Sequence, residues 1–152
     1  DRRPVAFAPG GETEQAAARL RILVLDDEPI VCKRLKPAFQ KAGYDVETFT
    51  DSAGALARLR EASFDIVITD LKMEGADGMQ VLSGALDSSP RTRVIVITGF
   101  ATLETAKESF RKGAFDFVAK PFKLGDIVDC VKRIEGELRD GKDRVASPVR
   151  IA

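Results

Sequence analysis

Short apolar runs alternate with amphipathic stretches along most of the chain. The runs are rich in Val, Ile and Phe, which predicts strands, and the stretches between them repeat apolar positions every three or four residues, which predicts helices. Each strand and the following helix occupy about 20 to 25 residues, and a crossover of this length makes neighbouring strands parallel. The pattern therefore predicts an α/β fold with strands at 21–26, 44–49, 64–70, 93–98 and 115–119 and helices at 29–42, 52–62, 78–87, 101–112 and 124–138.

Individual residues add detail to the predicted helices. Gly43 follows the first helix, where a glycine C-cap is common. Pro37 lies inside that helix and predicts a kink or a break, because proline removes a backbone hydrogen bond. In the fourth helix, Leu103, Ala106 and Phe110 form the apolar side.

Both ends of the chain depart from the alternating pattern. Residues 1–20 contain two prolines and two glycines, and residues 141–152 are largely polar. A chain of 152 residues is typical of a single domain. We therefore expect a flexible N-terminal tail at 1–20, one domain at 21–140 and a short C-terminal tail at 141–152.

The composition narrows the possible function classes. The 24 basic and 24 acidic residues balance, whereas a nucleic-acid-binding domain usually has a basic surplus, so direct nucleic-acid binding is not expected. No membrane-length apolar run and no signal-peptide pattern is present, so we expect a cytoplasmic chain without a membrane segment. Cys32 and Cys130 lack metal-ligand spacing and are expected to be small buried side chains. The absence of histidine excludes Ser-His-Asp and Cys-His catalysis and histidine-bound zinc.

Polar residues stand at the carboxyl ends of four predicted buried strands. Asp26 and Asp27 end the first strand, Asp70 the third, Thr98 the fourth and Lys120 the fifth. Taken singly, each has an ordinary explanation as a helix cap, a strand end or a surface turn. A parallel sheet brings all four strand ends to one edge, where open α/β sheets bind their ligands, so the joint placement predicts a functional site.

The types of these residues suit phosphoryl chemistry. Clustered carboxylates repel one another unless a cation joins them, and their oxygens suit Mg²⁺. A carboxylate between a metal and Lys120 can attack phosphorus and form an acyl phosphate, while the Thr98 hydroxyl donates to a phosphoryl oxygen. Two alternatives remain open at this point: an aspartate-nucleophile hydrolase or phosphotransferase acting on a small substrate, and a docking module that works without phosphorylation.

Five short motifs give the chain a resemblance to a known family. They are Leu25-Asp26-Asp27-Glu28, Ile68-Thr69-Asp70-Leu71-Lys72-Met73, Asp77-Gly78, Ile97-Thr98-Gly99 and Phe117-Val118-Ala119-Lys120-Pro121. Together they resemble the receiver domain of two-component response regulators over about residues 21–140. Within that family, the segments after the fourth strand and before the fifth are most similar to receivers of enhancer-binding transcription activators.

The resemblance implies a fold and a mechanism. The fold would be a flavodoxin-like three-layer (βα)5 sandwich with a parallel five-stranded sheet of order 2-1-3-4-5. Asp70 would accept a phosphoryl group from the histidine of a partner kinase or phosphotransfer protein, and the chain would catalyse only its own phosphorylation and dephosphorylation. Mg²⁺ would be bound by Asp26, Asp27, Asp70 and the backbone carbonyl of Lys72.

The resemblance also implies a switch. Thr98 and Phe117 would form the switch pair, Lys120 would contact the phosphoryl group, and the Lys120–Pro121 peptide bond would be cis. A surface within residues 101–139 would then change shape and dock a partner or a second copy. The chain departs from the family pattern at Glu74, where proline is usual, and at Phe117, where tyrosine is commoner.

Overall fold

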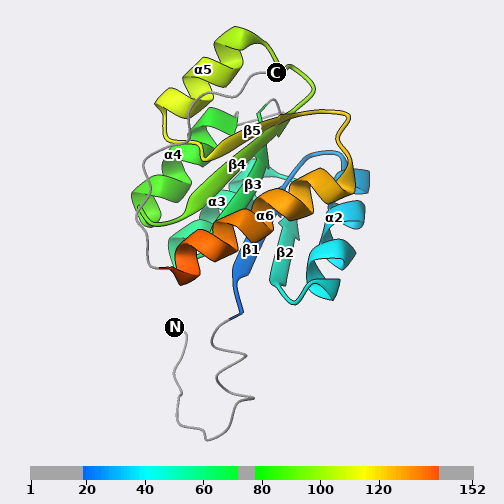
Figure 1. Ribbon diagram of the computed structural model, residues 1–152. Helices are drawn as coiled ribbons and strands as arrows, with labels where there is room; N and C mark the ends of the chain where they lie inside the picture. Colours follow the sequence, from blue (N-terminus) through cyan, green and yellow to red (C-terminus); the bar gives the residue numbers. More distant parts are fainter. Residues whose placement is uncertain (1–18, 72–77, 141–152) are drawn as a thin grey trace, which may run out of the picture.

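Five parallel strands form one sheet at the centre of the molecule (Figure 1). The computed structural model describes residues 19–71 and 78–140. The strands lie in the order β2-β1-β3-β4-β5, which confirms the predicted flavodoxin-like arrangement. Their bounds are β1 Arg21–Leu25, β2 Asp45–Phe49, β3 Ile66–Asp70, β4 Arg93–Thr98 and β5 Asp116–Ala119.

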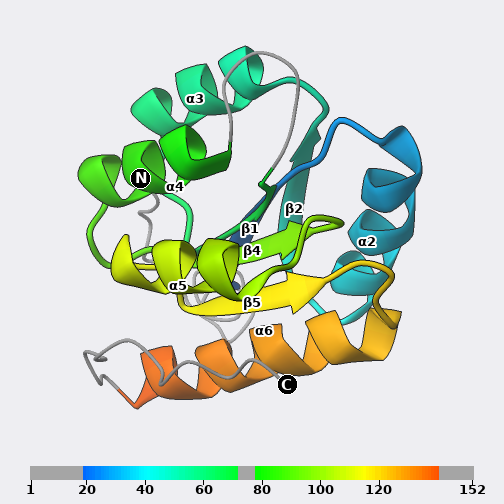
Figure 2. The same ribbon diagram turned by 90° about the horizontal axis from the view of Figure 1, so that it is seen from above.

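Helices cover both faces of this sheet. Figure 2 shows α2 and α6 on one face and α3, α4 and α5 on the other, so the molecule has three layers. The central strands β1, β3 and β4 are buried on both faces because each lies between two helical layers, which explains their continuous apolar sequences. The helices are α2 Pro29–Lys41, α3 Ser52–Glu61, α4 Gly78–Ser88, α5 Leu103–Arg111 and α6 Leu124–Arg139.

The alternation of side chains along each strand divides the core into two clusters. Ile22 and Val24 of β1 pack toward α2 and α6, whereas Leu23 and Leu25 pack toward α3 and α4. The strand register aligns the carboxyl ends, since Leu25 pairs with Thr69 and Thr98 pairs with Ala119. The polar residues that follow these ends therefore meet at one edge of the sheet.

The structure corrects two details of the predicted helices. Helix α2 does not break at Pro37 but continues through it, because this proline lies on the exposed side of the helix, where water can replace the missing hydrogen bond; a kink at Pro37 stays a prediction. Leu103 does not join the core and is 55% exposed. Because α5 begins two residues later than predicted, Leu103 occupies its first turn and borders a groove beside β5 and α6.

Other local predictions are confirmed. Gly43 follows α2 with a φ of 99°, a left-handed conformation that side chains disfavour. Cys32 and Cys130 are both buried, and neither forms a disulfide bond. None of the helices within the described residues has the length and apolar character that crossing a membrane requires.

Candidate functional site

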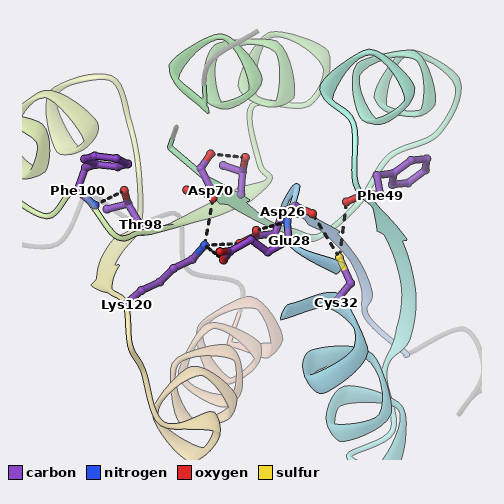
Figure 3. A network of polar contacts seen from close by, with 9 residues as sticks. Asp26, Glu28, Cys32, Phe49, Asp70, Thr98, Phe100 and Lys120 are labelled. Atoms are coloured by element: carbon purple, nitrogen blue, oxygen red, sulfur yellow. Dashed lines mark hydrogen bonds and ion pairs between the residues drawn. The ribbon is translucent and has the colours of Figure 1, made fainter. Parts of the chain in front are cut away.

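Lys120 lies at the centre of a cluster of carboxylates at the carboxyl edge of the sheet (Figure 3). Its Nζ atom lies 2.8 Å from Asp26 Oδ2, 3.0 Å from Glu28 Oε1 and 3.1 Å from Asp70 Oδ2. The structure thus brings together Asp26, Asp70 and Lys120, which the sequence places on three different strand ends. Glu28 joins them as a third carboxylate on the same ammonium group.

Burial makes this cluster electrostatically unusual. The side chains of Asp26 and Asp70 are 0% and 6% exposed, and that of Lys120 is 16% exposed. Burial raises the pKa of the Asp26 carboxyl, although hydrogen bonds from Lys120 and from the backbone N–H of Glu28 oppose the shift. Burial alone would lower the pKa of Lys120, but the three carboxylates hold it above its usual value. The cluster therefore carries an excess of negative charge around one firmly protonated lysine.

Three acidic side chains could hold a metal ion at this site. One carboxylate oxygen each of Asp26, Asp27 and Asp70 lie within 4.8 Å of one another. Asp27 is exposed, so the cluster opens to solvent on its side. A set of oxygen donors fits hard divalent cations such as Mg²⁺ and Ca²⁺, and an added cation would balance the surplus carboxylate charge. The fourth predicted ligand, the Lys72 carbonyl, lies outside the described residues, as does Glu74.

Thr98 lies at the end of β4, between β3 and β5, and is fully buried. Its hydroxyl oxygen accepts a hydrogen bond of 2.9 Å from the backbone N–H of Phe100, and its carbonyl oxygen accepts one from the backbone N–H of Lys120. Phe117 is partly buried and packs against the core cluster beneath α3 and α4. The Lys120–Pro121 peptide bond is cis.

Gly78 packs directly against the backbone of the predicted acceptor aspartate. Its N–H donates to the Leu71 carbonyl at 2.8 Å, and a Cβ atom at this position would lie 2.6 Å from the Leu71 Cα and would also overlap the Asp70 carbonyl. A side chain cannot be placed there without moving the end of β3. The Asp77-Gly78 motif thus has a steric basis, although Asp77 itself lies outside the described residues.

Sequence reasoning misses two contacts of the site. It names Glu28 only as the last residue of the first family motif, yet this residue contacts Lys120 with a side chain that is 61% exposed. The run Asp26-Asp27-Glu28 carries a usable signal, because three consecutive acids after a buried strand place at least two at the sheet edge. The hydrogen bond from the Phe100 N–H to Thr98 has no such signal. Its donor is a backbone group, and the residue types of a loop do not reveal where its backbone N–H groups point.

Most of the chain matches the model of a known protein family. The model for the response regulator receiver domain matches residues 22–132. The chain belongs to this family. Its receiver domain is 32% identical, over 114 residues, to the response regulator receiver protein CpdR of Brucella abortus, with 75% of this chain and 95% of CpdR covered.

Longer regulators also match this receiver domain. It is 37% identical over 113 residues to the regulatory protein AtoC of Escherichia coli, with 74% of this chain but 24% of AtoC covered, and 31% identical to the DNA-binding transcriptional regulator NtrC of the same organism. The chain thus spans about a quarter of the length of these relatives. The finer resemblance to receivers of enhancer-binding activators is confirmed by these matches.

Solved structures agree with the fold. A CheY-like receiver domain protein from Methanospirillum hungatei superposes with a TM-score of 0.78 at 27% identity, covering 82% of this chain and 99% of that one. A receiver domain protein from Clostridium thermocellum gives a TM-score of 0.74 at 30% identity, covering 81% and 99%.

Proposed function

We propose that Asp70 is the phosphoryl acceptor of a phosphorelay and that a partner histidine kinase or histidine phosphotransfer protein is the donor. The observation that carries this proposal is the position of the Asp70 carboxylate, buried at the end of β3 between the Lys120 ammonium and the Asp26–Asp27 pair. A carboxylate there can approach phosphorus while positive charge on one side neutralises the phosphoryl oxygens.

The reaction is a transfer in which Asp70 replaces a nitrogen at phosphorus. A carboxylate oxygen of Asp70 forms the new P–O bond, the P–N bond of the donor phosphohistidine breaks, and the released imidazole takes up a proton from water. The Lys120 ammonium then contacts the phosphoryl oxygens in place of one of its carboxylate partners. Mg²⁺ bound by Asp26, Asp27 and Asp70 would neutralise the charge that develops on the phosphoryl group. The chain promotes only its own modification and its reversal, so we do not class it as an enzyme.

The phosphoryl group would act as a switch through Thr98 and Phe117. The Thr98 hydroxyl turns toward the phosphoryl oxygens, and Phe117 moves into the space that Thr98 leaves. The two residues lie on neighbouring strands, since Phe117 of β5 pairs with Val96 of β4, two residues before Thr98. The affected surface includes a groove of about 790 Å³ beside α5, β5 and α6, lined by Leu103, Phe117, Ala119 and Arg133 among others. A partner or a second copy would dock within residues 101–139. A Thr98→Ala variant that docks as well as the parent after phosphorylation would contradict this switch.

Related structures support the acceptor role. The receiver domain of DrrB, 28% identical to this chain, was solved in a BeF3-activated form. A response regulator of the same fold from Burkholderia pseudomallei was solved with a phosphorylated aspartic acid and a calcium ion. We further propose that the reaction takes place in the cytoplasm and that this chain itself contacts neither membrane nor nucleic acid, since it has no basic surplus, with 24 basic and 24 acidic residues.

Intact mass after incubation with acetyl phosphate and Mg²⁺ tests the acceptor role. The parent should gain one phosphoryl group, about 80 Da as an acyl phosphate, and Asp70→Asn should gain none. Omitting Mg²⁺ should abolish the gain. No adduct, under conditions that label a control receiver, would favour a docking module that works without phosphorylation. Transfer from a phosphohistidine-bearing donor protein to Asp70 then tests the partner class.

A further inference from the structure

Two hydrogen bonds to the backbone of one residue, Phe100, join the Thr98 side chain to the start of α5. The backbone N–H of Phe100 donates to Thr98 Oγ1 at 2.9 Å, and the carbonyl oxygen of Phe100 accepts from the Thr105 hydroxyl at 3.0 Å. Thr105 is the third residue of α5. The backbone of Phe100 is thus held from one side by the predicted switch residue and from the other by the helix.

The Thr105 hydroxyl has more acceptors than its single proton can serve. Besides the Phe100 carbonyl, the Thr102 carbonyl oxygen also lies within reach, 3.1 Å from Thr105 Oγ1. The Thr105 Oγ1 atom in turn accepts a hydrogen bond from the Thr102 N–H. The Thr105 N–H in turn donates to Thr102 Oγ1, which completes a capping box. Two arrangements of the cap therefore have similar geometry, one tied to Phe100 and one closed within the helix.

The bonding continues from the cap into the packed part of the helix. The Ser109 hydroxyl, on a fully buried residue, donates to the Thr105 carbonyl at 2.8 Å. A change in the bonding of Thr105 thus lies one turn away from a buried position of α5. A helix cap alone needs only the Thr102 side chain, so the tie from Thr105 to Phe100 is an additional contact.

We propose that Thr105 is a positioning residue that transmits the state of Thr98 to the first turn of α5. The inference rests on the proposed function, because the phosphoryl group on Asp70 is what draws the Thr98 hydroxyl away from Phe100. Once the Phe100 N–H loses this acceptor, the backbone of Phe100 is free to rotate about its φ and ψ angles, and its carbonyl leaves Thr105. The Thr105 hydroxyl then donates its hydrogen bond to the Thr102 carbonyl instead. The first turn of α5 thereby loses its hydrogen bond to the loop after β4.

Hydrogen exchange at the amides of residues 103–106 tests the link in the phosphorylated-like state. With beryllofluoride and Mg²⁺, exchange at these amides of the parent should become about fivefold faster, the factor expected for the loss of one hydrogen bond. Thr105→Ser keeps the hydroxyl and should respond like the parent. Thr105→Val should exchange fast in both states and show no further change. Thr102→Val weakens the cap but leaves the Phe100 contact, so it should still respond to beryllofluoride.

A second measurement tests the link without phosphorylation. In the unmodified protein, Thr98→Val removes the acceptor of the Phe100 N–H and should speed exchange at residues 103–106 by a similar factor. In a Thr105→Val background the same substitution should add nothing, because coupled residues are not additive. Additive effects, or a parent that binds beryllofluoride with no change at α5, would overturn the inference. Coupling in the unmodified protein without any adduct on Asp70 would instead overturn the proposed function alone.

Discussion

The Nζ atom of Lys120 lies 3.1 Å from Oδ2 of Asp70, although 50 residues separate the two in the chain. Asp70 ends β3 and Lys120 follows β5, with β4 between them. The lysine therefore reaches across two strand spacings, roughly 10 Å, which only a long side chain can do. Thr98 ends β4, the strand between the two that carry these residues.

Replacement of Lys120 should destabilise the fold and make it dependent on a cation. Lys120→Gln leaves the buried Asp26 and Asp70 without their positive partner, so the free energy of unfolding should fall by about 3 kcal/mol. Added Mg²⁺ should restore part of this loss, because a cation among the carboxylates reduces their repulsion. Urea denaturation with EDTA and with Mg²⁺ measures both effects, with Lys107→Gln as a surface control. A Lys120→Gln protein as stable as the parent in EDTA would contradict the assigned role.

Replacement of Asp27 should weaken metal binding without destabilising the fold. Its exposed side chain shares the carboxylate cluster with two buried ones, so Asp27→Asn should barely change the stability without metal. The parent should melt at a higher temperature in Mg²⁺, since a ligand that binds only the folded state stabilises it. Asp27→Asn should lose most of this shift, whereas Asp51→Asn, at the cap of α3, should keep it. An unchanged shift in Asp27→Asn would remove this residue from the metal site.

Two glycines should respond to alanine with opposite signs. Gly78→Ala would force a Cβ against the backbone at the end of β3, and we expect it to lower the free energy of unfolding by about 2 kcal/mol. Gly136 lies within α6, and a Cβ there would meet no other part of the described chain within 4 Å, so Gly136→Ala should raise that free energy by about 1 kcal/mol. Urea denaturation of both variants compares them directly. Equal effects would mean that crowding at Gly78 is unimportant.

Phe100 is predicted to shield the acyl phosphate. Its backbone is held by Thr98 beside the site, while its side chain is 59% exposed. If the ring hinders an attacking water, Phe100→Ala should shorten the lifetime of the phosphorylated protein severalfold, as followed by intact mass over time. Leu103→Ala, which trims another exposed apolar side chain nearby in sequence, should leave the lifetime unchanged. Equal lifetimes for the parent and Phe100→Ala would show that the ring does not protect the phosphate.

The Arg58–Glu47 pair should contribute to stability only above acidic pH. Arg58 donates two hydrogen bonds to Glu47 and thereby lowers the pKa of its carboxyl below the usual value of about 4.3. A lowered folded-state pKa gives stability above the unfolded-state pKa, and this stability is lost as the pH falls through the folded-state value. Because both side chains are about one-third exposed, Glu47→Gln should cost only about 0.5 kcal/mol at pH 7.

The same substitution should cost less at pH 3 than at pH 7, because lowering the pH toward the folded-state pKa of Glu47 protonates this carboxyl in a larger fraction of the parent. Denaturation curves at both pH values test this, with the exposed Glu104→Gln on α5 as the control. A loss of stability of the same size at both pH values would show that packing, and not charge, explains the effect.

The order and type of the elements follow from the sequence alone. Apolar runs in β1, β3 and β4 are continuous because those strands are covered on both faces, and a pattern of this kind is visible in residue type. Predictions fail where the answer depends on a neighbour in space. The predicted break at Pro37 and the predicted place of Leu103 on the apolar side of its helix are wrong, because exposure depends on the side of the helix and on the residue at which the helix begins.

The same division holds for the site. The sequence by itself determined which chemical groups stand at the strand ends. Each of these residues lies at or just after the end of a recognisable apolar strand: Asp26, Asp27, Asp70, Thr98 and Lys120. Only the tertiary structure decided which of them touch. The contact of Glu28 with Lys120, the packing of Gly78 against β3 and the tie from Thr105 to Phe100 depend on distances between segments. Such distances are set by strand order and loop paths, which leave little trace in residue type.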